Sequence, residues 1–187
     1  MRRRLLDAAI ALLIERGYSG FRVAEVANLA KVSRGAQLHH FRTKDSMVLA
    51  ALEELYRRSD RASDRNLARA GAAPALKALA KDSQQFFFGK NFLASIDVLM
   101  SAAKDRALAR KVKDIPYRHR LRIEETWARH VARNGVPLAV ARDVVWLVHA
   151  VYRGLVFRTR VRHSAEQVQR VERLLMRLVE GFLERER

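Results

Sequence analysis

The stretch from residue 33 to residue 41 carries the side chains best suited to chemistry with a partner. It reads Ser-Arg-Gly-Ala-Gln-Leu-His-His-Phe, with one arginine, one glutamine and a histidine pair close together. A guanidinium can donate two hydrogen bonds to guanine O6 and N7, and an amide can pair with adenine N6 and N7. Basic side chains also attract phosphate groups. The stretch therefore holds the groups for contacts with nucleic acid, provided that one exposed helix presents them.

The charge of the whole chain points to the same class of partner. The formal net charge is +17, from 37 basic and 20 acidic side chains among 187 residues. A field of this size attracts polyanions, first nucleic acid and second an anionic membrane surface. The alternative is a set of solvated arginines without a partner. No window approaches about 18 uncharged apolar residues, so we expect no membrane-spanning helix.

The residues that other kinds of chemistry need are missing. The chain has no cysteine, which excludes disulfides and thiolate metal sites and is compatible with a reducing cytosol. Its histidines form no i, i+4 pair and no His-Glu-x-x-His motif, and no phosphate-binding glycine loop precedes Lys90. Glu124 and Glu125 are neighbours among arginines and indicate a salt-bridged surface. We therefore expect no enzyme, no metal and no cofactor, and a cytoplasmic location.

Helical periodicity runs through nearly the whole chain, and strand alternation appears nowhere convincingly, so the sequence predicts an all-α fold. Gly17 suits a left-handed residue after the first helix. Ser33, Thr43 and Ser164 suit helix N-caps. A broken stretch is expected around Pro116. The expected helices cover residues 3–16, 22–30, a short segment from 34, 44–70, 74–88, 92–104, a long segment that stops at 134–135, a segment that opens at 137, and a last segment after 164.

The first three helices are short and differ from the larger helical body that follows. Two short helices joined by a tight turn form a helix-turn-helix, whose second helix enters the DNA major groove. That helix must be exposed at its N-terminal end and braced from behind. Four apolar residues can brace it: Val26, Ala27, Val32 and Phe41. The alternative is a set of three ordinary core helices.

The same region resembles the N-terminal domain of TetR-family transcriptional regulators. The residues that carry the resemblance are Gly17, Tyr18, Val23, Val26, Ala27, Val32, Ser33, Arg34, Gly35, His39, His40, Phe41 and Lys44. The resemblance implies a helix-turn-helix DNA-binding domain at residues 1–43 and a helical effector-binding and dimerisation domain at residues 44–187. It also implies a homodimer that binds double-stranded DNA at a palindromic operator. A small-molecule effector in the second domain would weaken DNA binding, as in a repressor.

The resemblance further implies roles for individual residues. Arg34 and Gly35 would lie against the bases. His39, His40 and Lys44 match positions that contact phosphates, which fix the register and give salt-dependent affinity. The expected DNA-binding residues are Arg22, Ser33, Arg34, Gly35, Gln37, Leu38, His39, His40 and Lys44.

Several positions depart from the family pattern. Arg22 stands at the start of the second helix, where the family has threonine or serine, and would replace a neutral phosphate contact with a charged one. Lys31 stands in place of glycine and must accept a left-handed backbone or shift the turn, at about 1 kcal/mol. Gln37 and Leu38 lie four and three residues before Phe41, so both can share its face. Which of the two faces the DNA stays open: the amide would pair with adenine, and the leucine would cover a thymine methyl.

Large side chains of the body are candidates for lining an effector cavity. Three consecutive phenylalanines at 86–88 cannot all face one core on a helix, so at least one should face a pocket or a second surface. His149 is either a buried structural histidine or a polar group that contacts the effector. Such a cavity suits an apolar or aromatic effector, and the alternative for each residue is core packing. The expected effector-binding residues are Phe87, Phe88, Met100, Trp127, His149 and Tyr152.

The last two helices carry the pattern of a partner interface. In the last helix, apolar residues recur at spacings of three and four, and the stripe is too broad for one neighbour. Two such helices from each of two subunits would form a four-helix dimer interface. The alternative is a bundle within one chain. The two stripes are Val140, Val144, Leu147, Val148, Val151 and Leu155, and then Val168, Val171, Leu174, Leu175, Leu178, Val179 and Phe182.

Overall fold

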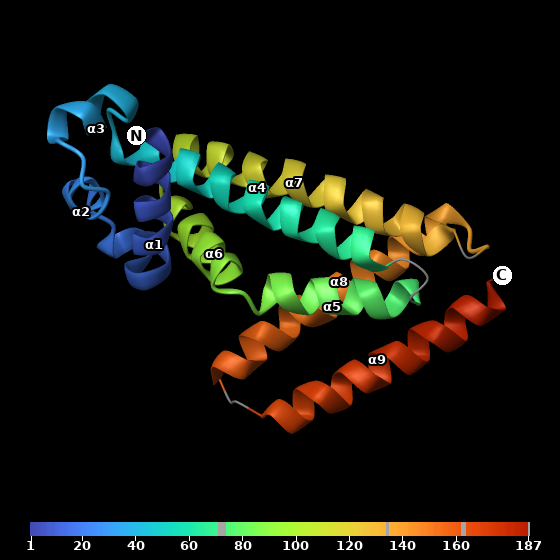
Figure 1. Cartoon of the computed structure of the whole chain (residues 1–187). Helices are drawn as coiled ribbons and strands as arrows, with labels where there is room; N and C mark the ends of the chain where they lie inside the picture. Colours follow the sequence, from blue (N-terminus) through green and yellow to red (C-terminus); the bar gives the residue numbers. More distant parts are fainter. Residues whose placement is uncertain (71–73, 134, 162–163, 187) are drawn as a thin grey trace. The chain divides into compact units, whose positions relative to one another are not determined.

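The computed structural model describes residues 1–70, 74–133, 135–161 and 164–186, and every regular element within them is an α-helix (Figure 1). The predicted all-α fold is thereby confirmed. None of the described helices is both long enough and apolar enough to cross a membrane. The helices are α1 (Arg2–Gly20), α2 (Val23–Leu29), α3 (Arg34–His40), α4 (Lys44–Ala70), α5 (Ala75–Phe87), α6 (Lys90–Ala102), α7 (Arg106–Ala132), α8 (Leu138–Val161) and α9 (Ala165–Arg185).

The chain folds as two compact units that are not continuous in sequence. The first unit comprises Met1–Asp60 and Lys90–His119, and the second comprises Arg61–Gly89 and Arg120–Arg187. The long helices α4 and α7 therefore contribute residues to both units. The sequence instead predicts two units that meet at residue 43, and that division into a DNA-binding domain and an effector-binding domain stays a prediction.

The first unit begins with a helix that is bent where the sequence predicts its end. Gly17 has φ 66°, in the left-handed region, and interrupts the helical dihedrals of α1. The next backbone N–H, that of Tyr18, donates to Asp97 Oδ2 of α6 at 2.6 Å. A Cβ on Gly17 would lie 2.7 Å from the same oxygen. The left-handed dihedral favours glycine here, and a Cβ would also displace the Asp97 carboxylate that accepts the Tyr18 N–H.

The predicted N-caps are present as local hydrogen bonds. The backbone N–H of Ser46 donates to Thr43 Oγ1 at 3.1 Å, and the N–H of Thr43 donates to Ser46 Oγ at 3.2 Å. These two bonds form a capping box at the start of α4. Ser164 Oγ likewise accepts from the N–H of Gln167 at the start of α9, at 3.2 Å. The short-range chemistry of these residues was sufficient to place both helix starts.

The predicted break around Pro116 is wrong, because α7 runs through this residue without interruption. A proline inside a helix removes one backbone hydrogen bond and costs about 3 kcal/mol. Val112, Ile115 and Ile123 are buried on either side of it. Burial of each such side chain contributes about 1.5–3 kcal/mol. The packing of these side chains therefore outweighs the cost of the proline.

The second unit is held by a buried polar cluster that joins three helices. Asp82 of α5 accepts hydrogen bonds from Ser63 Oγ (2.9 Å) and Asn66 Nδ2 (2.7 Å) of α4. The indole Nε1 of Trp127 in α7 donates to Asp82 Oδ2 at 3.1 Å and to Ser63 Oγ at 2.9 Å. Asp82 and Trp127 are buried. Buried polar groups are tolerated when they are paired, as they are here.

The buried face of α8 differs from the stripe that the sequence predicts. Val144 and Val148 are buried as expected, but Leu147 is half exposed, and His149 and Tyr152 face the interior in its place. Helix α5 packs against α8, and α9 contacts both, so the second unit covers α8 on this side (Figure 1). Apolar residues occur on two faces of α8, and periodicity alone could not rank the faces.

Of the two alternatives that the sequence leaves open for Lys31, a left-handed backbone or a shifted turn, the structure has the left-handed backbone, with φ 53°. Because this conformation is strained for any residue with a Cβ, we expect Lys31→Gly to raise the free energy of unfolding by about 1 kcal/mol. Lys31→Ala is the matched control, because it removes the charge but keeps the strain. Thermal unfolding of the three proteins checks this. Equal stabilisation by glycine and alanine would attribute the gain to charge and contradict the account.

Candidate nucleic-acid interface and effector-binding site

Helix α3 is short, capped at its start and exposed along one side. Ser33 Oγ accepts from the N–H of Ala36 at 3.3 Å, which satisfies one of the free donors of the first turn. Arg34 and Gly35 follow directly and are exposed. A Cβ added to Gly35 would meet nothing within 4 Å, so the surface there is open to close approach from outside. Val26, Ala27, Val32 and Phe41 are buried behind the helix, and their predicted bracing role is confirmed.

The open question of Gln37 and Leu38 is resolved by their burial. Gln37 is only 3% exposed, and its amide Nε2 donates to the backbone oxygen of Phe41. Leu38 is 42% exposed. The Phe41 carbonyl lies just past the end of α3, where backbone acceptors lack partners inside the helix, and the amide supplies one. The expectation that Gln37 contacts bases is therefore corrected, and Leu38 is the residue on the open face.

Two of the expected phosphate contacts are engaged within the chain. Lys44 is half buried, and its Nζ donates to the Tyr18 backbone oxygen at 2.8 Å and lies 4.1 Å from the centre of the Tyr18 ring. Burial, together with the charge of Arg22, lowers the pKa of Lys44. Arg22 itself is exposed and donates to the Ser19 oxygen at 2.7 Å, but its side chain does not cap α2. His39 is exposed and His40 half buried, and their rings meet edge to face.

A second basic group lies beside α3, and the sequence analysis missed it. Arg2, Arg3 and Arg4 are exposed in the first turn of α1. The Arg4 guanidinium donates to the Lys31 oxygen at 3.3 Å, and that of Arg2 lies 5.6 Å from the centre of the Phe41 ring. The start of α1 thus reaches both ends of α3. The sequence contained a usable indication, because the positive end of the helix dipole disfavours cations in a first turn.

The expected effector-binding residues are only partly brought together. Phe87, Trp127, His149 and Tyr152 are buried in the second unit, and the rings of Phe87 and His149 lie 5.5 Å apart. Met100 belongs to the first unit and is 63% exposed, so its expected role in the same cavity is corrected. Phe92 and Val98 of the same helix, by contrast, are buried. Phe88 is half buried at the end of α5.

His149 is the centre of a buried polar group. Arg120 donates to its Nδ1 at 3.0 Å, and Glu124 Oε1 lies 3.4 Å from the same atom. The Arg120 guanidinium also stacks over Phe86, at 4.3 Å from the ring centre. Burial, reinforced by the charge of Arg120, lowers the pKa of His149 to about 4 against the opposing effect of Glu124. Sequence reasoning missed Arg120 and placed Glu124 on a salt-bridged surface, but the Glu124 side chain is only 16% exposed and faces His149. The i, i+4 spacing of Arg120 and Glu124 on one helix was the available indication.

This pKa predicts a loss of stability in mild acid. An unfolded histidine binds a proton as the pH falls below about 6.5, whereas His149 in the fold stays neutral down to about 4. The free energy of unfolding should therefore fall by about 2 kcal/mol from this group between pH 7 and pH 5. Denaturant unfolding at both pH values measures it, with His149→Gln as the control. An equal pH dependence in the variant would remove His149 as the cause.

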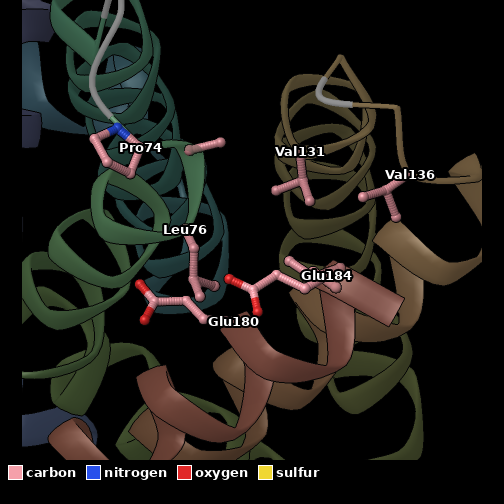
Figure 2. A pocket seen from close by; sticks show the side chains of 8 residues that line it. Pro74, Leu76, Val131, Val136, Glu180 and Glu184 are labelled. Atoms are coloured by element: carbon pink, nitrogen blue, oxygen red, sulfur yellow. The ribbon is translucent and has the colours of Figure 1, made fainter. Parts of the chain in front are cut away.

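Two hollows lie in the second unit, and only one of them is lined by an expected effector-binding residue. One, of about 350 Å³, has apolar walls with Glu180 and Glu184 at one side, and it contains none of the expected effector-binding residues (Figure 2). In Figure 2, Pro74 and Leu76 stand opposite Val131. The other, of about 660 Å³, includes Tyr152. Burial and the nearby Glu172 raise the pKa of Tyr152, so its hydroxyl stays protonated.

Comparisons with known proteins agree with the geometry of α1 to α3. Residues 5–51 match the family described as bacterial regulatory proteins, tetR family. The HTH-type transcriptional regulator CymR of Pseudomonas putida is 34% identical over 169 residues, which cover 90% of this chain and 83% of CymR. The chain belongs to the TetR family. The TetR-family resemblance of the N-terminal residues is thereby confirmed for the chain as a whole.

Further TetR-family relatives support the same assignment. The HTH-type transcriptional repressor KstR of Mycobacterium tuberculosis (strain ATCC 25618 / H37Rv) is 31% identical, over 96% of this chain and 80% of KstR. The crystal structure of FadR from Bacillus subtilis, in complex with stearoyl-CoA, shares the fold with a TM-score of 0.64 at 18% identity, covering 94% of this chain and 97% of FadR. This TetR-family chain is therefore a DNA-binding transcriptional regulator, and its relatives are regulators rather than enzymes.

Proposed function

We propose that this TetR-family regulator acts as a homodimeric repressor in the cytoplasm and binds a palindromic operator through α3. The observation that carries the proposal is the exposed start of α3, where Arg34 and Gly35 stand free beside a capped helix end. A bidentate arginine at this position reads guanine in the major groove, and the missing Cβ at residue 35 allows the backbone to approach the bases. Leu38 then covers a thymine methyl.

The arginines at the start of α1 extend this interface. Arg2 and Arg4 lie at the two ends of α3 through their contacts with Phe41 and Lys31. A reading helix in the groove is flanked by phosphates, so side chains at its two ends meet the DNA backbone. Three cations in a first helical turn oppose the helix dipole, and a polyanionic partner offsets that cost. We assign phosphate contacts to these arginines. Lys44 is less available for such a contact, because its Nζ donates to the Tyr18 backbone oxygen.

The dimer forms through exposed apolar faces of α8 and α9. Trp146 of α8 is 70% exposed and Leu178 of α9 is 63% exposed. Leu147, Leu174 and Phe182 are exposed on the same two helices, whereas Leu175 and Val179 pack inward. Several large apolar side chains exposed on two helices that contact each other are the composition of a protein interface. The broad stripe of α9 thus serves two neighbours, one within the chain and one in the second subunit.

The effector binds in the second unit, beside Phe87 and His149. These rings, with Arg120 and Glu124, combine apolar surface with a few polar groups, as small-molecule sites do. The ligand is apolar or aromatic, and the crystal structure of FadR from Bacillus subtilis, which shares the fold, contains stearoyl-CoA. Because α4 follows α3 directly in the chain and contributes residues to both units, its movement would change the spacing of the two α3 helices. That spacing must match one DNA turn, roughly 34–36 Å.

The test compares two arginines with different assigned roles. Arg34→Ala should weaken binding to an operator selected from random duplexes by about 1–3 kcal/mol and relax its sequence preference. Arg2→Ala, the matched control, should weaken operator and bulk DNA alike and reduce the salt slope by about 1 per subunit. Fluorescence anisotropy at several salt concentrations gives both quantities.

A second candidate function follows from the net charge of +17. A non-specific polyanion binder would hold any duplex with equal strength and strong salt dependence. Competition between a selected operator and bulk DNA at physiological salt separates the two. Equal affinity for both, or an Arg34→Ala protein that keeps the parent's sequence preference, would replace the operator proposal with this one.

A further inference from the structure

The 660 Å³ hollow of the second unit is a groove whose lining carries an excess of positive charge. It lies along α5 and α9 and reaches Tyr152 of α8. Lys77 and Lys81 line it from α5, and Arg173 and Arg177 line it from α9. Its volume lies within the range of about 300–1,000 Å³ found for small-molecule sites. The groove therefore has the size for a ligand and a lining dominated by cations.

The spacing of these cations is unfavourable for the isolated fold. Lys77 and Lys81 stand at i, i+4 on one helix, and Arg173 and Arg177 stand at i, i+4 on the other. Like charges at this spacing destabilise a helix. Among the described residues, none of the four forms a salt bridge with a carboxylate. Two repelling pairs that line one groove are the arrangement expected where a bound anion supplies the missing counter-charge.

Glu172 is the single acidic residue in the lining, and its side chain is half buried. It forms a hydrogen bond with the Tyr152 hydroxyl, and its Oε1 is buried without a partner among the described residues. Burial raises the pKa of Glu172. Even with Glu172 ionised, four cations against one carboxylate leave three positive charges in excess. Gln84 and Gln169 add amide donors at the edge.

We propose that this groove binds a small organic anion with at least two negative charges, such as a phosphorylated metabolite. Arginine forks and lysine ammonium groups on facing helices would hold its phosphate or carboxylate groups by charge-assisted hydrogen bonds. The site is separate from the α3 surface and from the cluster around His149. It does not depend on the operator or on the identity of the apolar effector.

Isothermal titration with sodium tripolyphosphate, at a constant ionic strength of about 0.15 M, tests the site without DNA. The full chain should bind one tripolyphosphate per subunit. Lys77→Gln with Lys81→Gln should weaken binding about tenfold, because two charge contacts are lost. Glu172→Gln should tighten it about threefold, because it removes the only negative group while an amide can still pair with Tyr152.

The matched control removes two exposed arginines at the same i, i+4 spacing on α7, by Arg106→Gln with Arg110→Gln. Circular dichroism confirms that each variant is folded. The proposal predicts that this control binds tripolyphosphate within about twofold of the parent. Equal weakening in the α5 and α7 variants would show attraction by net charge alone and overturn the site. Unchanged binding in the α5 variant would place the anion outside this groove and would overturn the proposal as well.

Discussion

Replacing Leu174 and Leu178 of α9 with glutamate is expected to turn the dimer into monomers and to lower operator affinity by about a hundredfold or more. Both side chains are exposed in the single chain and belong to the face assigned to the second subunit. A carboxylate buried there without a partner would cost several kcal/mol. A monomer presents one α3 and reads one half-site, so it loses half of the contacts with a palindrome.

Analytical ultracentrifugation gives the mass, and fluorescence anisotropy with the selected operator gives the affinity. The control carries the same change of net charge on another side of α9, by Gln169→Glu with Arg173→Gln. Both of these residues line the groove and lie away from the proposed dimer face. This control should remain dimeric and keep its affinity for the operator. A dimeric Leu174/Leu178 variant would show that the subunits associate through a different surface.

Trp127→Ala is expected to lower the free energy of unfolding by about 3–5 kcal/mol. The indole is fully buried, and its Nε1 donates to both Ser63 and Asp82. Truncation would leave a cavity and would remove the donor that faces the buried carboxylate of Asp82. The prediction decides between the two roles left open for this residue, core packing and effector contact.

Trp127→Phe separates packing from hydrogen bonding, because phenylalanine fills most of the space but has no N–H. Trp127→Phe should lower the free energy of unfolding by about 1–3 kcal/mol, because the oxygens of Ser63 and Asp82 lose the N–H that donates to them. Denaturant unfolding of both variants gives the two values. If Trp127→Ala left the stability unchanged and altered only the response to an effector, the indole would line a ligand cavity.

Local chemistry was enough to predict the ends of several helices. Ser33, Thr43 and Ser164 accept the backbone N–H groups that their positions imply, and Gly17 has the left-handed backbone expected of it. Each of these features depends on atoms within about four residues of one another. The sequence contains all of the partners in such interactions, so it is sufficient to place them.

Features that depend on competition between faces were not predictable in this way. Gln37 and Leu38 share the face of Phe41, and only the packed position of α3 against α2 shows that the amide turns inward. Leu147 belongs to the predicted apolar stripe of α8 but is half exposed, whereas His149, for which burial was one of two alternatives, lies in the interior. In each case two faces of one helix are apolar enough to be buried. The helix that packs against it decides which of the two faces is buried.

By itself, the sequence determined the all-α fold, the braced reading helix and its family, because periodicity, caps and a short motif are written in adjacent residues. Only the tertiary structure decided that Arg2 and Arg4 stand at the ends of α3, that Arg120 and Glu124 meet His149, and that four cations line one groove. These groups are separated by tens of residues along the chain. Their proximity comes from the packing of whole helices, which no local pattern records.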